Sequence, residues 1–462
     1  MNLTKIHSYS ERSKNPFLLV FGITLIIRIV NYYSLIPSKF DTLLFTGITV
    51  WAFIITMMDI LTRNFKLDKT DYLLVVFLGA ILISTFVNGP TGVVDNIKLL
   101  IWQFIYLFAV FRIGKDASHR TIFPLFEKIL IGCWNLLVLI SLGMFVVNYS
   151  YVESFDKFYN GFRAGFVENR LYGMFADPNF ASATSVAIIF LALKMFLSKK
   201  NKFTSVYSIL TIVLQTLYVI LSGSRTSEIA LFTCAFFVAF FMMYHRLSKT
   251  MLVKLLFSFL CALLVSGLTL GVLEAGKNVA PKVATITARH VPGRVKQDPE
   301  TKTKEEISLR RADVADKDDV SNNRFALWKS SFEIFESSPI VGSSPRNIFE
   351  YAEENLPTTF IATKKQTSHN FVFYLLATTG LLGTVPFLVF LIIKIWQTLK
   401  RLFTENVVSY DVFLLDTMVV LAILISALFL TELVLVNKIG SFIFWLYLGG
   451  ISTPKLIKQK SE

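Results

Sequence analysis

The sequence predicts an all-α polytopic membrane protein with about twelve transmembrane helices and one large extracytoplasmic loop domain between helices 9 and 10. Hydrophobic residues make up 54% of the 462 residues, and charged residues make up only 17%. A mean hydropathy of +0.58 excludes a soluble globular protein of this length. Apolar runs of about 17 to 25 residues recur along the chain, and each can cross a hydrocarbon core of about 30 Å as a helix.

The apolar runs divide the chain into four parts. They lie at residues 17–35, 42–62, 72–88, 97–113, 123–147, 180–197, 204–221, 226–244, 252–273, 370–397, 412–430 and 432–450. In the predicted division, residues 1–273 hold transmembrane helices 1–9, residues 274–368 form an extracytoplasmic, partly helical loop domain, residues 369–450 hold helices 10–12, and residues 451–462 form a basic cytoplasmic tail.

The formal net charge of +14 would indicate a nucleic-acid partner in a soluble protein. Here the basic residues gather in every second short loop, for example Arg63 and Lys66 after the second run and Lys199 and Lys200 after the sixth. Such loops mark the cytoplasmic side of a membrane protein. We therefore expect a multi-pass protein of the cytoplasmic (inner) membrane, with both termini in the cytoplasm and no nucleic-acid partner.

Arg28 and the cysteines lie inside apolar runs, where each has a structural explanation. Arg28 either faces the bundle interior or a polar cavity, or reaches the headgroup region from a tilted helix, and both interpretations stay open. Cys133, Cys234 and Cys261 are interpreted as packing residues, and they indicate neither a disulfide nor a metal site.

The outward loop at residues 148–179 ends in Asp177-Pro178-Asn179, which is typical of a helix start. Asp177 can cap the helix, and Pro178 fits the first turn because its missing N–H costs nothing there. Arg170 has no such structural explanation. It is one of few basic residues on the predicted outer side, which makes it a candidate for binding an anion.

A very short loop, Ser222-Gly223-Ser224-Arg225-Thr226-Ser227-Glu228, joins the seventh and eighth runs. Backbone N–H groups at the start of the eighth helix and the helix dipole favour an anion there, with Arg225 beside them. The alternative is an ordinary capped turn whose arginine reaches lipid headgroups. The scarcity of positive charge on the outer side favours the anion site.

Within residues 274–368, the sequence predicts a helix at residues 322–336. Its aromatic residues recur at helical spacing and form one face, interpreted as packing against the membrane or the rest of the loop: Phe325, Trp328, Phe332 and Phe335. Arg324 stands at the start of this helix, and a turn-rich connection from Ser337 to Arg346 follows it.

Two of the five histidines can serve chemistry on the outer face, because His7, His119 and His245 fall in predicted cytoplasmic segments. Of these two, His290 lies in an unpatterned stretch. His369 is predicted to lie in the first turn of the tenth span, where the helix dipole disfavours the charged imidazolium. A neutral imidazole there is a candidate general base.

Four motifs on the predicted outer side share an order and spacing. They are Arg170-x-x-Gly173 followed by Pro178-Asn179, then Ser224-Arg225-Thr226, then Arg324 and Trp328 leading to Ser338-Pro339-Ile340-Val341-Gly342, and last His369-Asn370-x9-Gly380-x-x-Gly383. Together they resemble the family of O-antigen ligases and O-antigen or capsular polysaccharide polymerases, the WaaL- and Wzy-like membrane glycosyltransferases. That family often has a second glycine after the Pro-Ile-Val-Gly turn, where this chain has Ser343 and Ser344.

The resemblance implies a metal-independent, inverting glycosyltransferase that needs no cofactor. It would transfer a glycan from undecaprenyl diphosphate to an acceptor hydroxyl on the outer face, with the lipid-linked donor, a glycan or glycolipid acceptor and membrane lipids as partners. His369 would deprotonate or orient the hydroxyl, and one direct displacement needs no carboxylate pair. The residues implied to bind the diphosphate and to replace a divalent cation are Arg225, Arg324, Arg170 and Arg346. The remaining motif and helix-start positions are Ser224, Asn179, Asn370, Gly380 and Gly383.

Two other classes of function stay open as alternatives. A lipid-linked oligosaccharide flippase would have buried charges at the membrane midplane, paired broken helices and two related halves, of which the sequence shows little beyond Arg28. A membrane scaffold would leave the outward arginines and His369 unexplained. Polymerase and ligase differ in the acceptor, and the Lys-, Ile- and Phe-rich composition hints at capsule polymerisation or transfer of a teichoic-acid-like polymer to a glycolipid.

Overall fold

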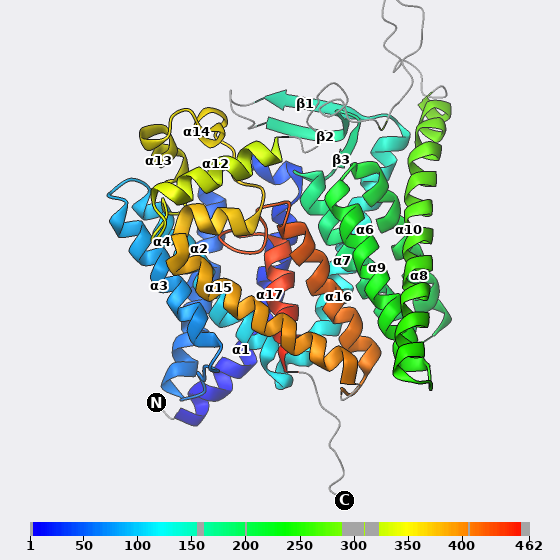
Figure 1. The fold of residues 1–462 in the computed structure, drawn as a ribbon, viewed down its shortest axis with the longest axis horizontal. Helices are drawn as coiled ribbons and strands as arrows, with labels where there is room; N and C mark the ends of the chain where they lie inside the picture. Colours follow the sequence, from blue (N-terminus) through cyan, green and yellow to red (C-terminus); the bar gives the residue numbers. More distant parts are fainter. Residues whose placement is uncertain are drawn as a thin grey trace, which may run out of the picture.

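The computed structural model describes residues 3–154, 161–198, 201–288, 309, 323–404 and 407–453. Within these residues the chain forms a bundle of long helices (Figure 1). The helices are α1 (Leu3–Arg28), α2 (Ser38–Leu61), α3 (Asp71–Val87), α4 (Val93–Ile105), α5 (Phe111–Lys115), α6 (Ile122–Val146), α7 (Pro178–Leu197), α8 (Lys202–Ser222), α9 (Arg225–Arg246), α10 (Met251–Ala288), α12 (Arg324–Ser337), α13 (Ile348–Asn355), α14 (Phe360–Lys364), α15 (Phe371–Thr404), α16 (Tyr410–Ala427) and α17 (Ile439–Ser452). The short connecting helices are η1 (Asn31–Leu35), the π-helical η2 (Tyr106–Val110) and η3 (Ala117–Thr121).

Nine helical segments within the described residues are long and apolar enough to cross a membrane. The shorter helices α3 and α17 are also apolar. The predicted class, an all-α polytopic membrane protein, is confirmed, and the number of spans stays a prediction. Helix α10 continues to Ala288, past the end of the apolar run at residue 273.

The bundle has two distinct ends. The β-sheet and helices α12, α13 and α14 lie at one end, which we call the loop end (Figure 1). The N-terminus lies at the opposite end, which we call the terminal end. Helix α1 ends at Arg28, whose Nε lies 3.5 Å from Asp41 Oδ1 and whose Cζ lies 4.5 Å from the centre of the Phe45 ring. Arg28 is therefore half-buried at the end of α1, whereas the sequence interpretation placed it inside the first apolar run.

A three-stranded antiparallel sheet lies between α6 and α7, where the sequence predicted only a loop. Its strands, in hydrogen-bonded order, are β1 (Ser150–Ser154), β2 (Gly161–Val167) and β3 (Arg170–Gly173). Glu168 and Asn169 form the turn between β2 and β3, with φ of 53° and 58°, and a tight hairpin needs this left-handed pair. The prediction was wrong because such short strands carry too few residues for a clear alternating pattern.

Helix α15 is broken at Gly380, where φ is 56° and ψ is −159°. A break leaves backbone N–H and C=O groups without helical partners, which is costly in a buried position. The turn after α12 supplies partners on both sides of the break. The N–H groups of Ser343 and Ser344 donate to the Ala377 and Thr378 carbonyls, both at 2.9 Å, and those of Leu381 and Leu382 donate to the Pro339 (2.8 Å) and Ile340 (3.0 Å) carbonyls.

Two glycines allow this turn and α15 to approach so closely. A Cβ atom at Gly380 would lie 2.4 Å from the Ile340 carbonyl carbon, and one at Gly342 would lie 2.4 Å from the Thr378 carbonyl carbon. Ser344 is one of the two serines that follow the Pro-Ile-Val-Gly turn. Its φ of 66° is the left-handed value that glycine favours, and its Oγ accepts a hydrogen bond from Asn96 Nδ2 at 2.8 Å.

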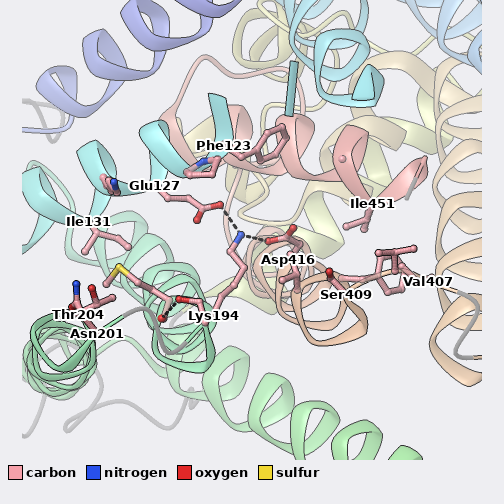
Figure 2. A pocket seen from close by; sticks show the side chains of 18 residues that line it. Phe123, Glu127, Ile131, Lys194, Asn201, Thr204, Val407, Ser409, Asp416 and Ile451 are labelled. Atoms are coloured by element: carbon pink, nitrogen blue, oxygen red, sulfur yellow. Dashed lines mark hydrogen bonds and ion pairs between the residues drawn. The ribbon is translucent and has the colours of Figure 1, made fainter. Parts of the chain in front are cut away.

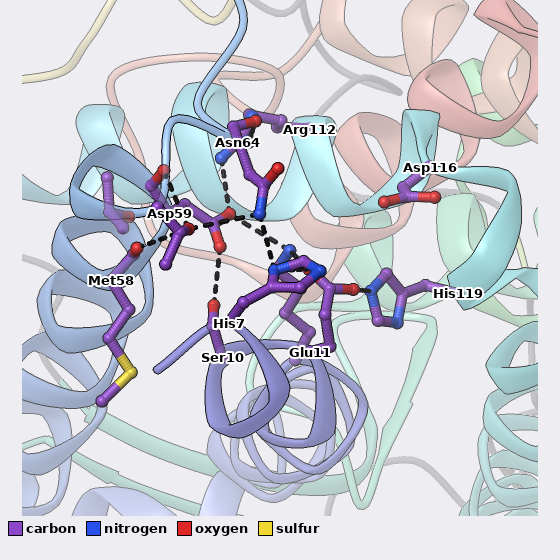
Figure 3. Close-up of polar contacts among 12 residues, drawn as sticks. His7, Ser10, Glu11, Met58, Asp59, Asn64, Arg112, Asp116 and His119 are labelled. Atoms are coloured by element: carbon purple, nitrogen blue, oxygen red, sulfur yellow. Dashed lines mark hydrogen bonds and ion pairs between the residues drawn. The ribbon is translucent and has the colours of Figure 1, made fainter. Parts of the chain in front are cut away.

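Buried polar groups hold the first helices together at the terminal end (Figure 3). Asp59 of α2 is buried and accepts hydrogen bonds from Ser10 Oγ at 2.6 Å and from Arg112 Nη1 at 2.7 Å. Lys14 Nζ lies 3.1 Å from the same carboxylate. Since a buried carboxylate is tolerated only when it is paired, this network fixes α1 and α5 against α2.

The break in α15 gives a first testable prediction. Gly380→Ala is expected to lower the free energy of unfolding by about 2–4 kcal/mol, because the new Cβ meets backbone atoms at a positive φ. The matched control is Gly143→Ala in α6, where an added Cβ meets nothing within 4 Å. Thermal unfolding of both variants in detergent tests this. Equal unfolding temperatures for the two variants would contradict the role assigned to Gly380.

Candidate functional site

Helix α15 begins with a side-chain cap on Asn370. Asn370 Oδ1 accepts hydrogen bonds from the N–H groups of Val372 (2.8 Å) and Phe373 (3.2 Å). His369 precedes this cap with φ of 47°. The prediction that His369 lies in the first helical turn is therefore wrong by a short distance, because the asparagine after it takes the capping position.

The residues on both sides of His369 are tied to neighbouring elements. Ser331 Oγ of α12 donates a hydrogen bond to Ser368 Oγ at 2.6 Å. Asn370 Nδ2 donates to the Leu428 carbonyl, after the end of α16, at 2.8 Å. The ring of Trp328 also stacks on that of Phe373, with centroids 5.4 Å apart. These contacts fix the backbone at His369 from two directions, and they confirm that Trp328 is a packing residue.

The surroundings of His369 favour the neutral imidazole. Burial is the main cause and the positive charge of Arg324 is the next, and together they lower the pKa of His369 to about 4. Lys438 acts in the same direction, whereas Asp177 acts against it. Arg324 is the first residue of α12, and its Cζ lies 5.6 Å from the centre of the Phe429 ring. The sequence interpretation also predicted a neutral imidazole at His369, but it gave the helix dipole as the first cause.

Arg170 connects the start of α7 to the end of α8. Its side chain is only 6% exposed, its Nε donates to the Ser222 carbonyl at 2.8 Å, and its Nη2 donates to Asn179 Oδ1 at 2.6 Å. Asp177 caps α7 by accepting from the N–H of Asn179 at 2.7 Å. The predicted helix start at Asp177-Pro178 is confirmed. The contacts of Arg170 favour a role in positioning these helix ends.

Arg225 is the first residue of α9, and its side chain is exposed. Ser224 caps this helix by accepting from the Ser227 N–H at 3.4 Å. The hydroxyls of Ser227 and Ser182 lie 2.7 Å apart and join α9 to the first turns of α7. The capped turn considered as an alternative is thus present, and it leaves the Arg225 side chain exposed.

Arg346 and Gly383 lie near the break in α15. The side chain of Arg346 is exposed, and its backbone N–H donates to Asn96 Oδ1 at 3.0 Å. A Cβ at Gly383 would lie 2.5 Å from Thr379 Oγ1 and 3.4 Å from the Ala80 Cβ, so this glycine allows α15 to pack on α3. His290 lies outside the described residues.

The sequence interpretation missed two charged residues, Glu432 and Lys438. It placed both in a span at residues 432–450, whereas α17 begins only at Ile439 and residues 428–438 are not helical. Lys438 faces the first turn of α7, where its Nζ lies 3.1 Å from the centre of the Phe180 ring. The signal was the group Glu432, Asn437 and Lys438, since such polar residues are rare inside a transmembrane helix.

The terminal end also carries polar groups, but these pair with one another. A cavity of about 670 Å³ there contains Lys194, which forms ion pairs with Glu127 and Asp416 (Figure 2). Three possible metal ligands, Glu11, Asp116 and His119, lie near each other among the described residues. Glu11 Oε2 is 2.7 Å from His119 Nε2 (Figure 3), so an internal contact explains this cluster. Cys133, Cys234 and Cys261 are free thiols.

The apolar helices define a multi-pass membrane protein. A histidine, several arginines and several helix starts form a polar site at its loop end. Residues 210–388 match the family model Wzy_C, described as O-antigen ligase, and the match supports assignment of the chain to the O-antigen ligase and polymerase family. The resemblance that the motifs indicated is thereby confirmed over residues 210–388. The matched residues include Arg225, Arg324, Arg346 and His369. No curated protein sequence matches the chain.

The neutral state of His369 gives a second prediction. Exchange of its imidazole C2 proton for deuterium, followed by mass spectrometry across pH, should give a midpoint near the expected pKa of about 4. In Arg324→Gln the midpoint should rise, because removing a positive charge makes protonation easier. A wild-type midpoint near the ordinary value of about 6.5 would show that burial and Arg324 do not act on this histidine.

Proposed function

We propose that the protein is an inverting glycosyltransferase that moves a glycan from undecaprenyl diphosphate to an acceptor hydroxyl on the outer face of the cytoplasmic membrane. The observation that carries the proposal is His369 at the start of α15, inside the region that matches the O-antigen ligase family, where burial and the charge of Arg324 lower its pKa. The termini would lie in the cytoplasm, so that the loop end faces outward.

In the proposed reaction, His369 accepts the proton of the acceptor hydroxyl as its oxygen attacks the anomeric carbon of the donor sugar. The bond between that carbon and the diphosphate oxygen breaks, and undecaprenyl diphosphate leaves with the electron pair. A single displacement inverts the anomeric centre and needs no carboxylate nucleophile. The lowered pKa keeps the imidazole unprotonated at neutral pH and so free to accept a proton, but it also makes His369 a weaker base than one whose pKa lies near the working pH.

The arginines would neutralise the leaving diphosphate. Arg225 and Arg324 stand at the first positions of α9 and α12, where a planar guanidinium can donate two hydrogen bonds to phosphate oxygens. Arg170 would act by holding Asn179 and the α8 end in place. The exposed Arg346 is the fourth candidate. We propose that these cations act without a metal ion.

The acceptor decides between a polymerase and a ligase. A polymerase would use a second lipid-linked repeat unit, and a ligase would use a glycolipid, including transfer of a teichoic-acid-like polymer. Purified protein given a lipid-linked donor separates these activities from a flippase, because only a transferase forms a new glycosidic bond.

Replacement of the histidine tests the proposed base. His369→Ala should lower the rate of transfer by roughly 10²–10⁴-fold, since a positioned base contributes about that much, while the donor still binds. Product formation and donor binding are measured in parallel on reconstituted protein. His7→Ala, at the terminal end, is the matched control and should transfer normally. Near-normal transfer by His369→Ala would rule out the base.

The arginines and the absence of a metal requirement are tested together. Arg324→Lys should lower transfer roughly tenfold, because a lysine ammonium cannot form the two-pronged contact, and a chelator should leave wild-type transfer unchanged. An Asp-x-Asp sequence, Asp316-Lys317-Asp318, lies outside the described residues. Carboxylates of this kind can hold a divalent cation on a phosphate, so loss of transfer with a chelator would favour a metal-dependent reaction.

A further inference from the structure

The non-helical segment at residues 428–438 forms a wall of the site around His369. Its first residue, Leu428, accepts the hydrogen bond from Asn370 described above. Further along, the hydroxyls of Thr431 and Thr367 lie 3.2 Å apart. Phe429 of the same segment contacts the Arg324 guanidinium. The segment therefore contacts both the residues around His369 and the start of α12.

The middle of this segment, residues 430–435, is buried although it lacks helical hydrogen bonds. Side chains of other elements satisfy its backbone: Gln103 Oε1 accepts from the Leu435 N–H at 3.0 Å, and Trp445 Nε1 donates to the Leu433 carbonyl at 3.1 Å. Irregular backbone within a membrane protein is tolerated where it is buried in protein or lines a polar cavity. Such segments commonly build binding sites for ions and substrates.

Lys438 is the last residue of this segment, and its ammonium group has few hydrogen-bond acceptors nearby. Among the described residues, its Nζ donates one long hydrogen bond, to the Thr431 carbonyl at 3.4 Å, and otherwise lies on the Phe180 ring. An ammonium can donate three hydrogen bonds. Its partner Thr431 in turn contacts Thr367, which lies two residues before His369. The ammonium is thus close to the proposed base and has donors to spare.

The nearby Glu432 does not use those donors. Its carboxyl is 1% exposed, and neither oxygen has a hydrogen-bond partner among the described residues. A Cβ at Gly440 would lie 1.8 Å from Glu432 Oε1, which shows that the carboxyl is pressed against the first turn of α17. Burial raises the pKa of Glu432. Because neither oxygen of Glu432 accepts a hydrogen bond from Lys438, the Lys438 donors are available to another anion.

We propose that Lys438 binds the diphosphate of the lipid-linked donor, on a different wall of the site from Arg324. This inference rests on the proposed function, because it assigns a further residue to the same donor site. The guanidinium of Arg324 would supply directional hydrogen bonds, and the Lys438 ammonium would act as a compact charge that can reorient. Phe180 holds the ammonium in place before the donor arrives through a cation–π contact.

Binding of undecaprenyl diphosphate to protein in detergent tests this assignment. Lys438→Met should weaken binding about tenfold or more, because a charge-assisted hydrogen bond is lost, and Lys438→Arg should restore most of it. Binding of the uncharged lipid undecaprenol should stay unchanged in both variants. Lys98→Met is the matched control, since the Lys98 side chain is 67% exposed.

A further variant separates binding from a purely structural role. Glu432→Gln keeps the size of the side chain and cannot carry a charge, so it should preserve diphosphate binding. If Lys438 served only to pair with Glu432, Lys438→Met would bind the diphosphate as the wild type does. If Lys438→Met fails to fold, Glu432→Gln/Lys438→Met removes both buried ionisable groups and takes its place, with the same weakened binding expected.

The outcomes distinguish the two proposals. Unchanged diphosphate affinity in folded Lys438→Met, with weakened affinity in Arg324→Gln, would overturn the assignment of Lys438 and leave the proposed function standing. Wild-type protein that does not bind undecaprenyl diphosphate would overturn both.

Discussion

The backbone hydrogen bonds that join the 338–344 turn to the broken helix α15 are the constraint on which the site depends. A helix that stops and restarts inside a low-dielectric bundle must find new partners for the freed N–H and C=O groups. The turn provides them, and Ser84 Oγ and Asn88 Nδ2 of the α3 region add bonds to the Thr378 and Gly342 carbonyls at 2.9 and 2.8 Å. The same bonds place α12 and the start of α15 relative to each other, and so fix Arg324 near His369.

Helix starts gather at the loop end, but side-chain caps already occupy some of their backbone N–H groups. Asp177, Ser224 and Asn370 cap α7, α9 and α15 with their own side-chain oxygens. A diphosphate would therefore compete with these caps for backbone donors. Side-chain cations avoid that competition, because a guanidinium or an ammonium brings its own donors. This argument favours arginine and lysine side chains over bare helix ends as the principal contacts of an anionic donor.

Much of the fold could be predicted from the sequence because its signals were local. Long apolar runs gave the membrane class, Asp177-Pro178 gave the start of α7, and the aromatic spacing gave a helix at residues 322–336, close to the observed α12. The positions of the candidate residues at helix starts followed from the same capping rules. These features depend on a few neighbouring residues and are visible without any tertiary contact.

The features that the sequence interpretation missed depend on contacts between distant residues. Residues 428–438 join two apolar runs, and distant partners such as Gln103 and Trp445 stabilise their irregular backbone. Arg28 was placed inside the first apolar run because hydropathy does not show that α1 ends there. The sheet at residues 150–173 is held by strand pairing, which short segments encode weakly. The pairing of the Pro-Ile-Val-Gly turn with Gly380 likewise joins two motifs that looked independent.

The break at Gly380 also gives a meaning to the spacing within the His369-Asn370-x9-Gly380 motif. The intervening residues are the first section of α15, from its cap at Asn370 to its break, and at about 1.5 Å per residue they span roughly 14 Å. The number of residues in the motif therefore sets the distance between the break at Gly380, which the turn after α12 holds in place, and His369 at the loop end. It also sets the direction in which His369 points around the axis of α15, because each residue added or removed would turn His369 by about 100°. In this chain, sequence distance fixes both the height and the direction of the imidazole.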